Sequence, residues 1–174
     1  MMRTPHVTVS TRVMPHEIGQ KCVDAVRKIF PNFLVTDIPT EDSFPVEREM
    51  VEFVCDGVSP DLFVELLGNQ RILDTALDAM SLNLRADATN FLISRQAALS
   101  GKVAFVLETE RTVGGVVEVA LECDDLADWI QEVTWHPGRR EVPRSVGDEL
   151  SMRSDGSLTE WFDSKGRATF QTDD

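Results

Sequence analysis

The strongest constraint on the fold is an alternation of apolar and polar residues close to the amino terminus. In the stretch HVTVSTRVM (6–14), one face carries Val7, Val9, Thr11 and Val13, and the other carries His6, Thr8, Ser10 and Arg12. A period of two residues is the period of a β-strand, and only the apolar face of such a strand needs a covering layer. The pattern therefore predicts a half-buried strand with an open polar face.

Helices and further strands follow this first strand. A helix is predicted from Glu17 until Pro31 stops it, and a long helix from Ser59 to about Met80, where Ser-Pro-Asp is a strong helix start. The other predicted elements are strands at 33–38, 48–55, 89–94, 102–107 and 116–121 and a short helix at 126–133. Several strands alternate and few are continuously apolar. The order therefore predicts an α+β fold, a two-layer sandwich in which a mostly antiparallel sheet has helices on one face.

The composition changes after residue 133. Residues 134–149 are rich in Pro, Gly and Arg, which is typical of a linker. In 150–174, turn signals at Asp155-Gly156 and Lys165-Gly166 separate short alternating runs. The sequence thus predicts a core domain over 1–133, a linker over 134–149, and a small three-stranded meander or flexible tail over 150–174.

The charge of the chain bears on where it works. The formal net charge is −13, and only four of the 17 basic residues are lysine. An acidic excess with few lysines indicates adaptation to a salt-rich cytoplasm, where repulsion between carboxylates is screened. The first residues form no apolar signal region and no run approaches 18 apolar residues, so a cytoplasmic protein without a membrane partner is expected. In a halophilic cell the acidic total does not exclude a nucleic-acid ligand.

No motif indicates catalysis. The three histidines are scattered, and no phosphate loop or nucleophile motif is present. Acidic residues at Glu122, Asp124, Asp125 and Asp128 could hold a divalent ion, but capping of the helix at 126–133 explains the aspartate pair without a metal. We therefore expect no enzyme activity, no catalytic residues, no metal, no cofactor and no small-molecule substrate.

The basic residues concentrate in the middle of this acidic chain, where residues 66–107 carry a net charge of +1. Arg95 and Gln96 directly follow a predicted strand and Lys102 opens the next, which places two cations and an amide around one connection. Such a group suits contact with a phosphate. Arg71, three residues before Asp74, is equally consistent with a solvated helix face bearing an ion pair. Both interpretations remain open at this level.

Three motifs resemble an archaeal family. They are KIFP (28–31), QRILDTA (70–76) and FLISRQAALSGKVAF (91–105), and together they resemble uncharacterised protein family 0201. In the third motif, matches to the family pattern are Phe91, Gln96, Ala97, Ala98, Gly101, Lys102, Val103 and Phe105. The family commonly has Asn, Lys and Asn where this chain has Ser94, Arg95 and Ala104. The resemblance covers about Val7 to Glu132.

The resemblance implies a fold like that of large-subunit ribosomal protein five, a homodimer and an RNA-binding function. The leading hypothesis is thus a non-enzymatic protein that contacts the backbone of structured RNA or the ribosome. The candidate RNA-binding residues are Arg71, Arg95, Gln96 and Lys102, with Lys21 and Lys28, seven residues apart on the first helix, as a second patch. Under this hypothesis Arg95 and Gln96 contribute little to stability. The alternative is a dimeric protein-interaction module whose basic residues are structural.

Overall fold

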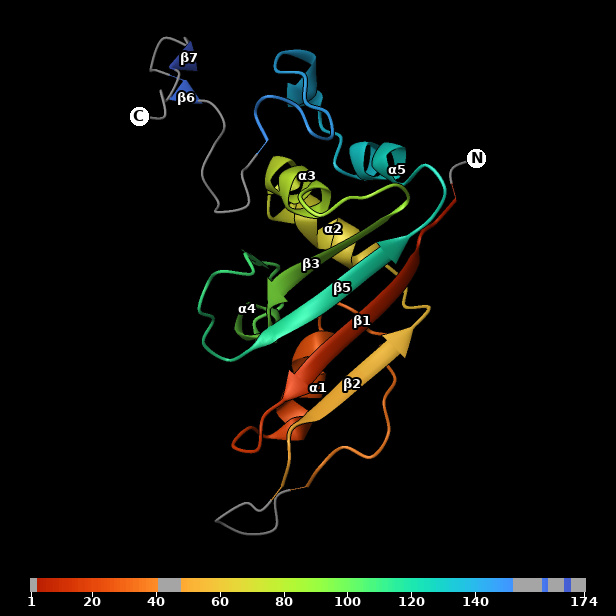
Figure 1. The fold of residues 1–174 in the computed structure, drawn as a ribbon, viewed down its shortest axis with the longest axis vertical. Helices are drawn as coiled ribbons and strands as arrows, with labels where there is room; N and C mark the ends of the chain where they lie inside the picture. Colours follow the sequence, from red (N-terminus) through yellow and green to blue (C-terminus); the bar gives the residue numbers. More distant parts are fainter. Residues whose placement is uncertain (1–2, 41–47, 152–160, 163–167, 170–174) are drawn as a thin grey trace.

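A five-stranded antiparallel sheet forms the centre of the molecule (Figure 1). The computed structural model describes residues 3–40 and 48–151, together with the backbone of two short strands at 161–162 and 168–169. The sheet has the order β2-β1-β5-β3-β4. Its strands are β1 (His6–Val13), β2 (Val51–Asp56), β3 (Ala88–Ser94), β4 (Phe105–Val106) and β5 (Val116–Glu122). The helices are α1 (Gly19–Arg27), α2 (Asp61–Asn69), α3 (Leu73–Ser81), α4 (Arg95–Leu99), α5 (Leu126–Val133) and the 3₁₀ helix η1 (Pro137–Arg140).

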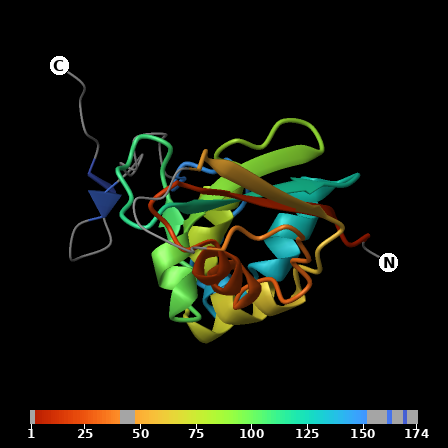
Figure 2. The ribbon, with the colours of Figure 1, turned by 90° about the horizontal axis from the view of Figure 1, so that it is seen from below.

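The helices lie on one side of the sheet, as Figure 2 shows when the molecule is seen from below. On β1, the predicted inward residues Val7, Val9, Thr11 and Val13 are all buried, while the alternate residues are exposed or half-buried. The buried face packs against α1, α3 and α5, and none of the described helices lies on the opposite face of the sheet. The predicted α+β two-layer sandwich is confirmed.

Aromatic rings join the two layers in the middle of the core. Phe63 on α2 stacks on Phe30 after α1 and on Phe91 in β3, with ring centroids 5.6 and 5.7 Å apart. Phe105 in β4 closes the group edge-on, 5.6 Å from Phe91. Such ring pairs contribute about 0.5–1.5 kcal/mol beyond the area that they bury. The cluster fixes α2 against the β3–β4 edge of the sheet.

The long helix predicted from Ser59 to Met80 is wrong, because the chain breaks into α2 and α3. At the end of α2, Ile72 donates its backbone N–H to the carbonyl of Leu67, and Arg71 donates to that of Gly68. This is the Schellman pattern of hydrogen bonds, and Arg71 occupies its left-handed position with a φ of 56°. The apolar periodicity continues through the break, so the sequence pattern does not reveal it.

Two predicted strands also differ from the structure. No strand forms over 33–38, where Asp37 has a φ of 58° that interrupts an extended chain. The strand predicted over 102–107 contracts to Phe105–Val106, because 95–99 form the unpredicted helix α4 and the chain then turns at Gly101. The other predicted strands and the last helix are present, with ends displaced by a few residues.

The segment predicted as a linker, 134–149, lies against the core. Thr134 and Arg139 are buried there, and Arg139 and Arg144 form ion pairs with α3. The meander predicted over 150–174 falls mostly outside the described residues. Of this segment the structure describes two short strands, β6 (Trp161–Phe162) and β7 (Ala168–Thr169), which pair antiparallel. The three-part division of the chain itself stays a prediction.

The left-handed residue at the end of α2 gives a stability prediction. Arg71 should be strained relative to glycine, because the left-handed region costs a residue with a Cβ about 1 kcal/mol. Arg71→Gly should therefore raise the free energy of unfolding by up to about 1 kcal/mol, measured by urea denaturation. The matched change is Gly101→Ala at the end of α4, where φ is 70° and an added Cβ meets no atom within 4 Å. It should lower stability by about the same amount. A loss of stability in Arg71→Gly would contradict the assignment of strain.

Candidate functional site

The structure places Arg95 inside the protein. Its side chain is 3% exposed, and the guanidinium donates from Nε to the carbonyl of Gly114 at 3.0 Å. Nη1 donates to the hydroxyl of Thr11 at 2.8 Å and to the carbonyl of Arg12 at 2.7 Å. Nη2 donates to Glu17 Oε1 at 2.5 Å. Arg95 therefore joins the end of β1, the loop before α1 and the loop before β5, and its guanidinium is not available to a phosphate.

Glu17 and Gly115 complete the surroundings of this buried cation. Although burial alone would raise it, the pKa of Glu17 lies below its ordinary value because the backbone N–H of Met14 and the guanidinium of Arg95 donate to its carboxylate. A Cβ added at Gly115 would lie 2.5 Å from Arg95 Nη2, so only glycine fits under the guanidinium plane. The sequence does not indicate that Glu17 pairs with Arg95 or that Gly115 makes room for its guanidinium.

Gln96 lies apart from the other predicted site residues. It is exposed on α4, and its Cβ would be 3.2 Å from a Cβ built on Gly114. Gln96 thus borders the loop between β4 and β5. The phosphate-binding group expected around Arg95, Gln96 and Lys102 does not assemble, because Arg95 turns inward and Gln96 lies beside that loop.

A side-chain amide connects the α2–α3 junction to the chain after α4. Gln70 Nε2 donates to the carbonyl of Val103 at 2.9 Å, and the N–H of Val103 donates to Gln70 Oε1 at 2.7 Å. This pair of bonds imitates one step of a β-ladder. It brings the neighbouring residues Arg71 and Lys102, both exposed, to the same part of the surface. Sequence spacing could not predict the contact, which joins residues 33 positions apart.

A lysine connects α1 to the same region. Lys28 caps the carboxyl end of α1, and its Nζ donates to the carbonyl of Leu99 at 2.7 Å, at the end of α4. Lys21 lies seven residues earlier and is also exposed. Seven residues are two helical turns, so Lys21 and Lys28 share one side of α1. We define the cation ridge as Lys21, Lys28, Arg71 and Lys102.

Three of the four cations of the ridge stand where a helix ends, while Lys21 lies in the first turn of α1. Lys28 is the C-cap of α1, and Arg71 directly follows the C-cap of α2. Lys102 donates its N–H to the carbonyl of Ala97 and Gly101 donates to that of Ala98, which is a second Schellman pattern, at the end of α4. The carboxyl end of a helix favours a cation by about 0.3–1 kcal/mol. This effect is a structural reason for a cation at each helix end. It does not explain why the three helix ends meet on one surface, which depends on the hydrogen bonds of Gln70 and Lys28.

Several of the other arginines are neutralised by carboxylates. Ion pairs join Arg3 to Asp124, Arg12 to Glu52, Arg139 to Asp74, and Arg144 to Asp78 and Asp148. Within the part of the chain that the structure describes, the four residues of the ridge form no ion pair with a carboxylate. The ridge is therefore a surface where cations from three helix ends are free to meet an anion, whereas Arg85 and Arg111 are exposed outside it.

Two cavities lie beside the predicted site residues, one next to Arg71 and one over Arg95. A cavity of about 320 Å³ lies at the α2–α3 junction, lined by Arg71, Asp74, Thr75 and His136 among others. A larger one of about 500 Å³ lies over the buried Arg95, with Arg12, Glu52 and Glu118 in its walls. The second cavity holds both signs of charge, with carboxylates in excess. Only the first adjoins the cation ridge.

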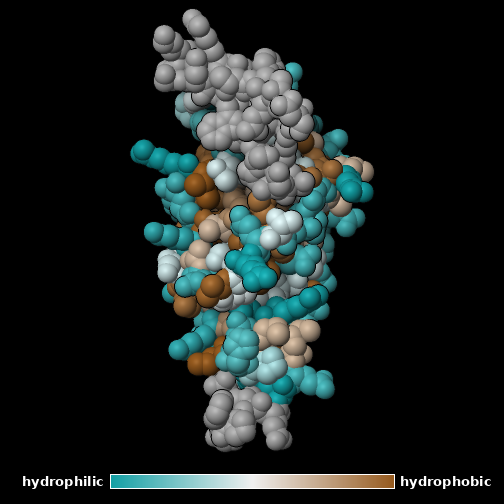
Figure 3. Space-filling model, turned by 60° about the vertical axis from the view of Figure 1, so that its left-hand side comes forward, coloured by the Kyte–Doolittle hydropathy of each residue, from teal (hydrophilic) through white to brown (hydrophobic). Residues whose placement is uncertain are grey.

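Apolar side chains are dispersed on the face of the molecule that Figure 3 shows. On the face shown in Figure 3, hydrophobic patches are small and separated by hydrophilic residues. Within residues 3–40 and 48–151, no group of three His, Cys, Asp or Glu side chains is arranged to hold a metal ion. Among the described helices, none has the length and hydrophobicity needed to cross a membrane.

Relatives of the chain carry one family name. The UPF0201 protein of Methanothermobacter thermautotrophicus is 30% identical over 142 residues, which cover 82% of this chain and 98% of that protein. The chain belongs to the UPF0201 family. A UPF0201 protein of the archaeon Sulfurisphaera tokodaii is 27% identical over 131 residues, covering 74% of this chain and 88% of that protein. No family model matches the chain.

Solved structures of the UPF0201 family have the same fold. The crystal structure of the UPF0201 protein from Methanococcus jannaschii has a TM-score of 0.62 at 27% identity, covering 75% of this chain and 99% of that one. A second UPF0201 crystal structure has a TM-score of 0.54 at 22% identity, covering 87% and 97%, and shows the fold alone. These neighbours do not test the expected likeness to large-subunit ribosomal protein five.

The three UPF0201-like motifs of the sequence meet at the cation ridge. Lys28 of KIFP bonds to Leu99, and Gln70 of QRILDTA bonds to Val103, both partners belonging to the third motif. Phe30, Phe91 and Phe105 of the first and third motifs share one aromatic cluster beneath. The segments that carry the family resemblance therefore build one part of the molecule.

The burial of Arg95 reverses the expectation that it matters little for stability. Arg95→Ala should lower the free energy of unfolding by about 3–5 kcal/mol, because it leaves Glu17 charged and unpaired in a largely buried position. Gln96→Ala, one residue along the same helix but exposed, should change it by less than about 0.5 kcal/mol. Thermal and urea unfolding measure both. Equal, small effects of the two changes would show that Arg95 does not hold the loops together.

Proposed function

We propose that this UPF0201 protein is non-enzymatic and binds the backbone of structured RNA, free or in the ribosome, along the cation ridge. The observation that carries the proposal is the convergence of Lys28, Arg71 and Lys102 from three separate helices. Two of the contacts that produce it, from Gln70 and Lys28, join motifs distant in sequence. Phosphate contacts from such cations position a protein on RNA without reading its sequence.

The conformation of Arg71 supports the same proposal. A glycine would fill its left-handed position with less strain, as it does at Gly101 in α4. A side chain kept in a strained conformation often serves a site rather than the fold. Arg71 is exposed, and the bonds between Gln70 and Val103 bring its backbone to the part of the surface that carries Lys102, so a phosphate bound there would meet both cations.

Shape recognition suits the ridge better than reading of single-stranded bases. The protein has no tyrosine, the aromatic rings of Phe30, Phe63 and Phe91 are buried in the core, and the exposed ring of Trp135 lies outside the ridge with Arg140 over it. Bases of single-stranded RNA usually stack on exposed aromatic rings. Contacts with the phosphates of a duplex or a folded RNA need only cations at suitable spacing.

The proposal predicts strongly salt-dependent binding. With about four phosphate contacts, the slope of log K against log salt should be near −3.6 for a duplex-like RNA, so a tenfold rise in KCl should weaken binding by about 10³–10⁴. Lys102→Gln should reduce the slope by about 0.9 and leave stability within about 1 kcal/mol. Fluorescence anisotropy with an RNA hairpin over a series of KCl concentrations measures the slope.

A matched control separates the ridge from general charge. Arg85→Gln removes an exposed cation that lies outside the ridge. It should leave the salt slope and the affinity unchanged, apart from a small long-range effect of net charge. If Arg85→Gln weakens binding as much as Lys102→Gln, or if no RNA hairpin binds at low salt, the ridge is not an RNA site and its cations serve the helix ends.

Self-association through the open face of the sheet is the second candidate function. That face exposes Val54 in β2, 54% exposed, in one row with Ser10, Glu118, Leu92 and Val106 of the neighbouring strands. Carboxylates outnumber arginines on the open face of the sheet, so two such faces repel each other. Salt screens this electrostatic repulsion and should therefore favour association. We propose on this ground a homodimer that strengthens in molar KCl.

Light scattering tests the dimer. In molar KCl the wild type should show about twice the 19.5 kDa of one chain, and Val54→Lys should shift the mass toward the monomer. Val113→Lys is the control, because Val113 is 80% exposed in the loop between β4 and β5 and lies off the sheet face. A wild-type monomer at micromolar concentration, or equal effects of both substitutions, would exclude this face as the interface.

A further inference from the structure

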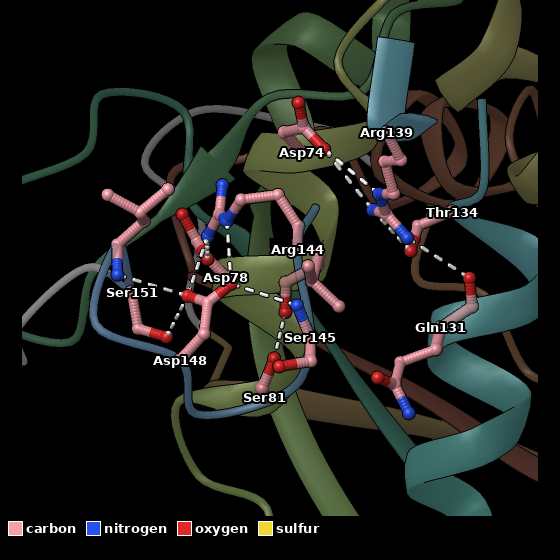
Figure 4. Close-up of polar contacts among 12 residues, drawn as sticks. Asp74, Asp78, Ser81, Gln131, Thr134, Arg139, Arg144, Ser145, Asp148 and Ser151 are labelled. Atoms are coloured by element: carbon pink, nitrogen blue, oxygen red, sulfur yellow. Dashed lines mark hydrogen bonds and ion pairs between the residues drawn. The ribbon is translucent and has the colours of Figure 1, made fainter. Parts of the chain in front are cut away.

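The chain after α5 crosses α3 and is held there by two arginines. We define the strap as residues 134–151. Figure 4 shows Arg139 pointing to Asp74 and Arg144 pointing to Asp78, one helical turn farther along α3. The two arginines come from the strap and the two aspartates from α3, so both contacts join segments about 65 residues apart in sequence.

The first contact surrounds Arg139, whose side chain is 5% exposed. Its Nε and Nη2 donate to Asp74 Oδ1 at 3.3 and 3.2 Å, and Nη1 donates to the carbonyl of Gln131 at 3.1 Å. Nη2 also donates to the hydroxyl of Thr134 at 3.0 Å. His136 Nε2 lies 3.0 Å from the same oxygen of Asp74. Although burial alone would raise it, the pKa of Asp74 is lowered by His136 and Arg139.

The second contact surrounds Arg144, whose side chain is 9% exposed. Nη2 donates to Asp78 Oδ1 at 2.5 Å, and Nε donates to Asp148 Oδ2 at 2.8 Å. Asp148 also accepts the N–H of Ser145 and the hydroxyl of Ser151, so it shapes the turn that presents Arg144. The cation thus links the strap to itself and to α3.

Apolar contact contributes less to the strap than these charges. Val146 is the strap residue that packs against the hydrophobic core, while Val142 is 56% exposed. The backbone from Pro137 to Val142 lies largely at the surface. By comparison, α3 buries Ala76, Leu77, Ala79 and Met80 beneath the sheet. The strap therefore lacks the buried apolar area that ties the helices to the core.

We propose that the strap is an ionically latched lid, which opens and closes as a unit over α3 while the sheet and the helices beneath stay folded. The reason lies in how a buried ion pair contributes to stability. When a whole pair separates into water, both charges regain hydration, and this gain nearly cancels their lost attraction. Segments with few apolar contacts open at low free energy compared with global unfolding. Both conditions apply to the strap.

Opening would change the cavity at the α2–α3 junction. His136 is the strap's contribution to the wall of that cavity, which Arg71 and Thr75 also line. With the strap open, the cavity loses this wall and Asp74 is left charged beside Arg71. The closed latch therefore keeps the α3 carboxylates neutralised next to the cation ridge. This consequence for RNA rests on the proposed function, whereas the latch itself does not.

Hydrogen–deuterium exchange of the full chain tests the latch without any ligand. In the wild type, the hydrogen-bonded amides of the strap, such as those of Glu141, Val142 and Asp148, should exchange at least tenfold faster than those of β1 and β5. At low concentrations of urea, the amides of the strap should still be the first to exchange. If strap and sheet amides exchange together at every urea concentration, the strap is part of the global fold and the proposal is overturned.

Substitutions assign the latch to its arginines. Arg144→Gln leaves Asp78 without its cation and should speed exchange of the strap at least tenfold, with β1 and β5 unchanged. Arg140→Gln is the matched control on the same strap, because Arg140 is exposed and lies over the Trp135 ring, 5.7 Å from its centroid, and forms no ion pair with a described carboxylate. Equal exchange in the two variants would refute an Arg144 latch. Faster exchange throughout the chain in Arg144→Gln would refute an independent lid.

Discussion

The guanidinium of Arg95 fixes the parts of the molecule on which the rest depends. It binds the hydroxyl of Thr11, two carbonyls and the carboxylate of Glu17, and so joins β1, the loop before α1 and the loop before β5 around the first residue of α4. Because a buried arginine must satisfy its donors, these loops have little freedom to move apart. α4 is thereby held at the edge of the sheet, and its last turn offers Leu99 to Lys28.

The position of α4 then determines where the surface cations lie. Lys28 reaches the end of α4, and Gln70 pairs with the backbone of Val103 just after it. Three helix ends meet as a result, each carrying a cation that also suits the local dipole. A structural role and a binding role therefore share the same residues. The two roles separate in their effects: the first changes stability slightly, and the second changes affinity and its dependence on salt.

Sequence patterns predicted the features of the fold that depend on residues close together in the chain. The alternation in β1 predicted its buried face because a strand has a fixed period of two, and the sandwich followed from several such strands. The break after Gln70 was not predictable, because helical periodicity continues through it and the bond to Val103 is tertiary. Arg95 directly follows a strand, a position where an arginine is usually exposed. Nothing in the sequence around it indicates that Glu17, 78 residues away, neutralises it. Of the six candidate residues, the four cations that stay exposed without a carboxylate partner form the ridge, while Gln96 is exposed beside another loop and Arg95 is buried.

The most direct test of the account is an NMR titration of the labelled protein with an RNA hairpin at low KCl. The 19.5 kDa chain is small enough for its amide signals to be assigned individually. The account predicts that the largest shifts fall on the amides around Lys28, Arg71 and Lys102, where three helices end, and that these shifts disappear as KCl is raised. Shifts centred on the open face of the sheet, around Ser10 and Ala120, or no shifts at low salt, would contradict it.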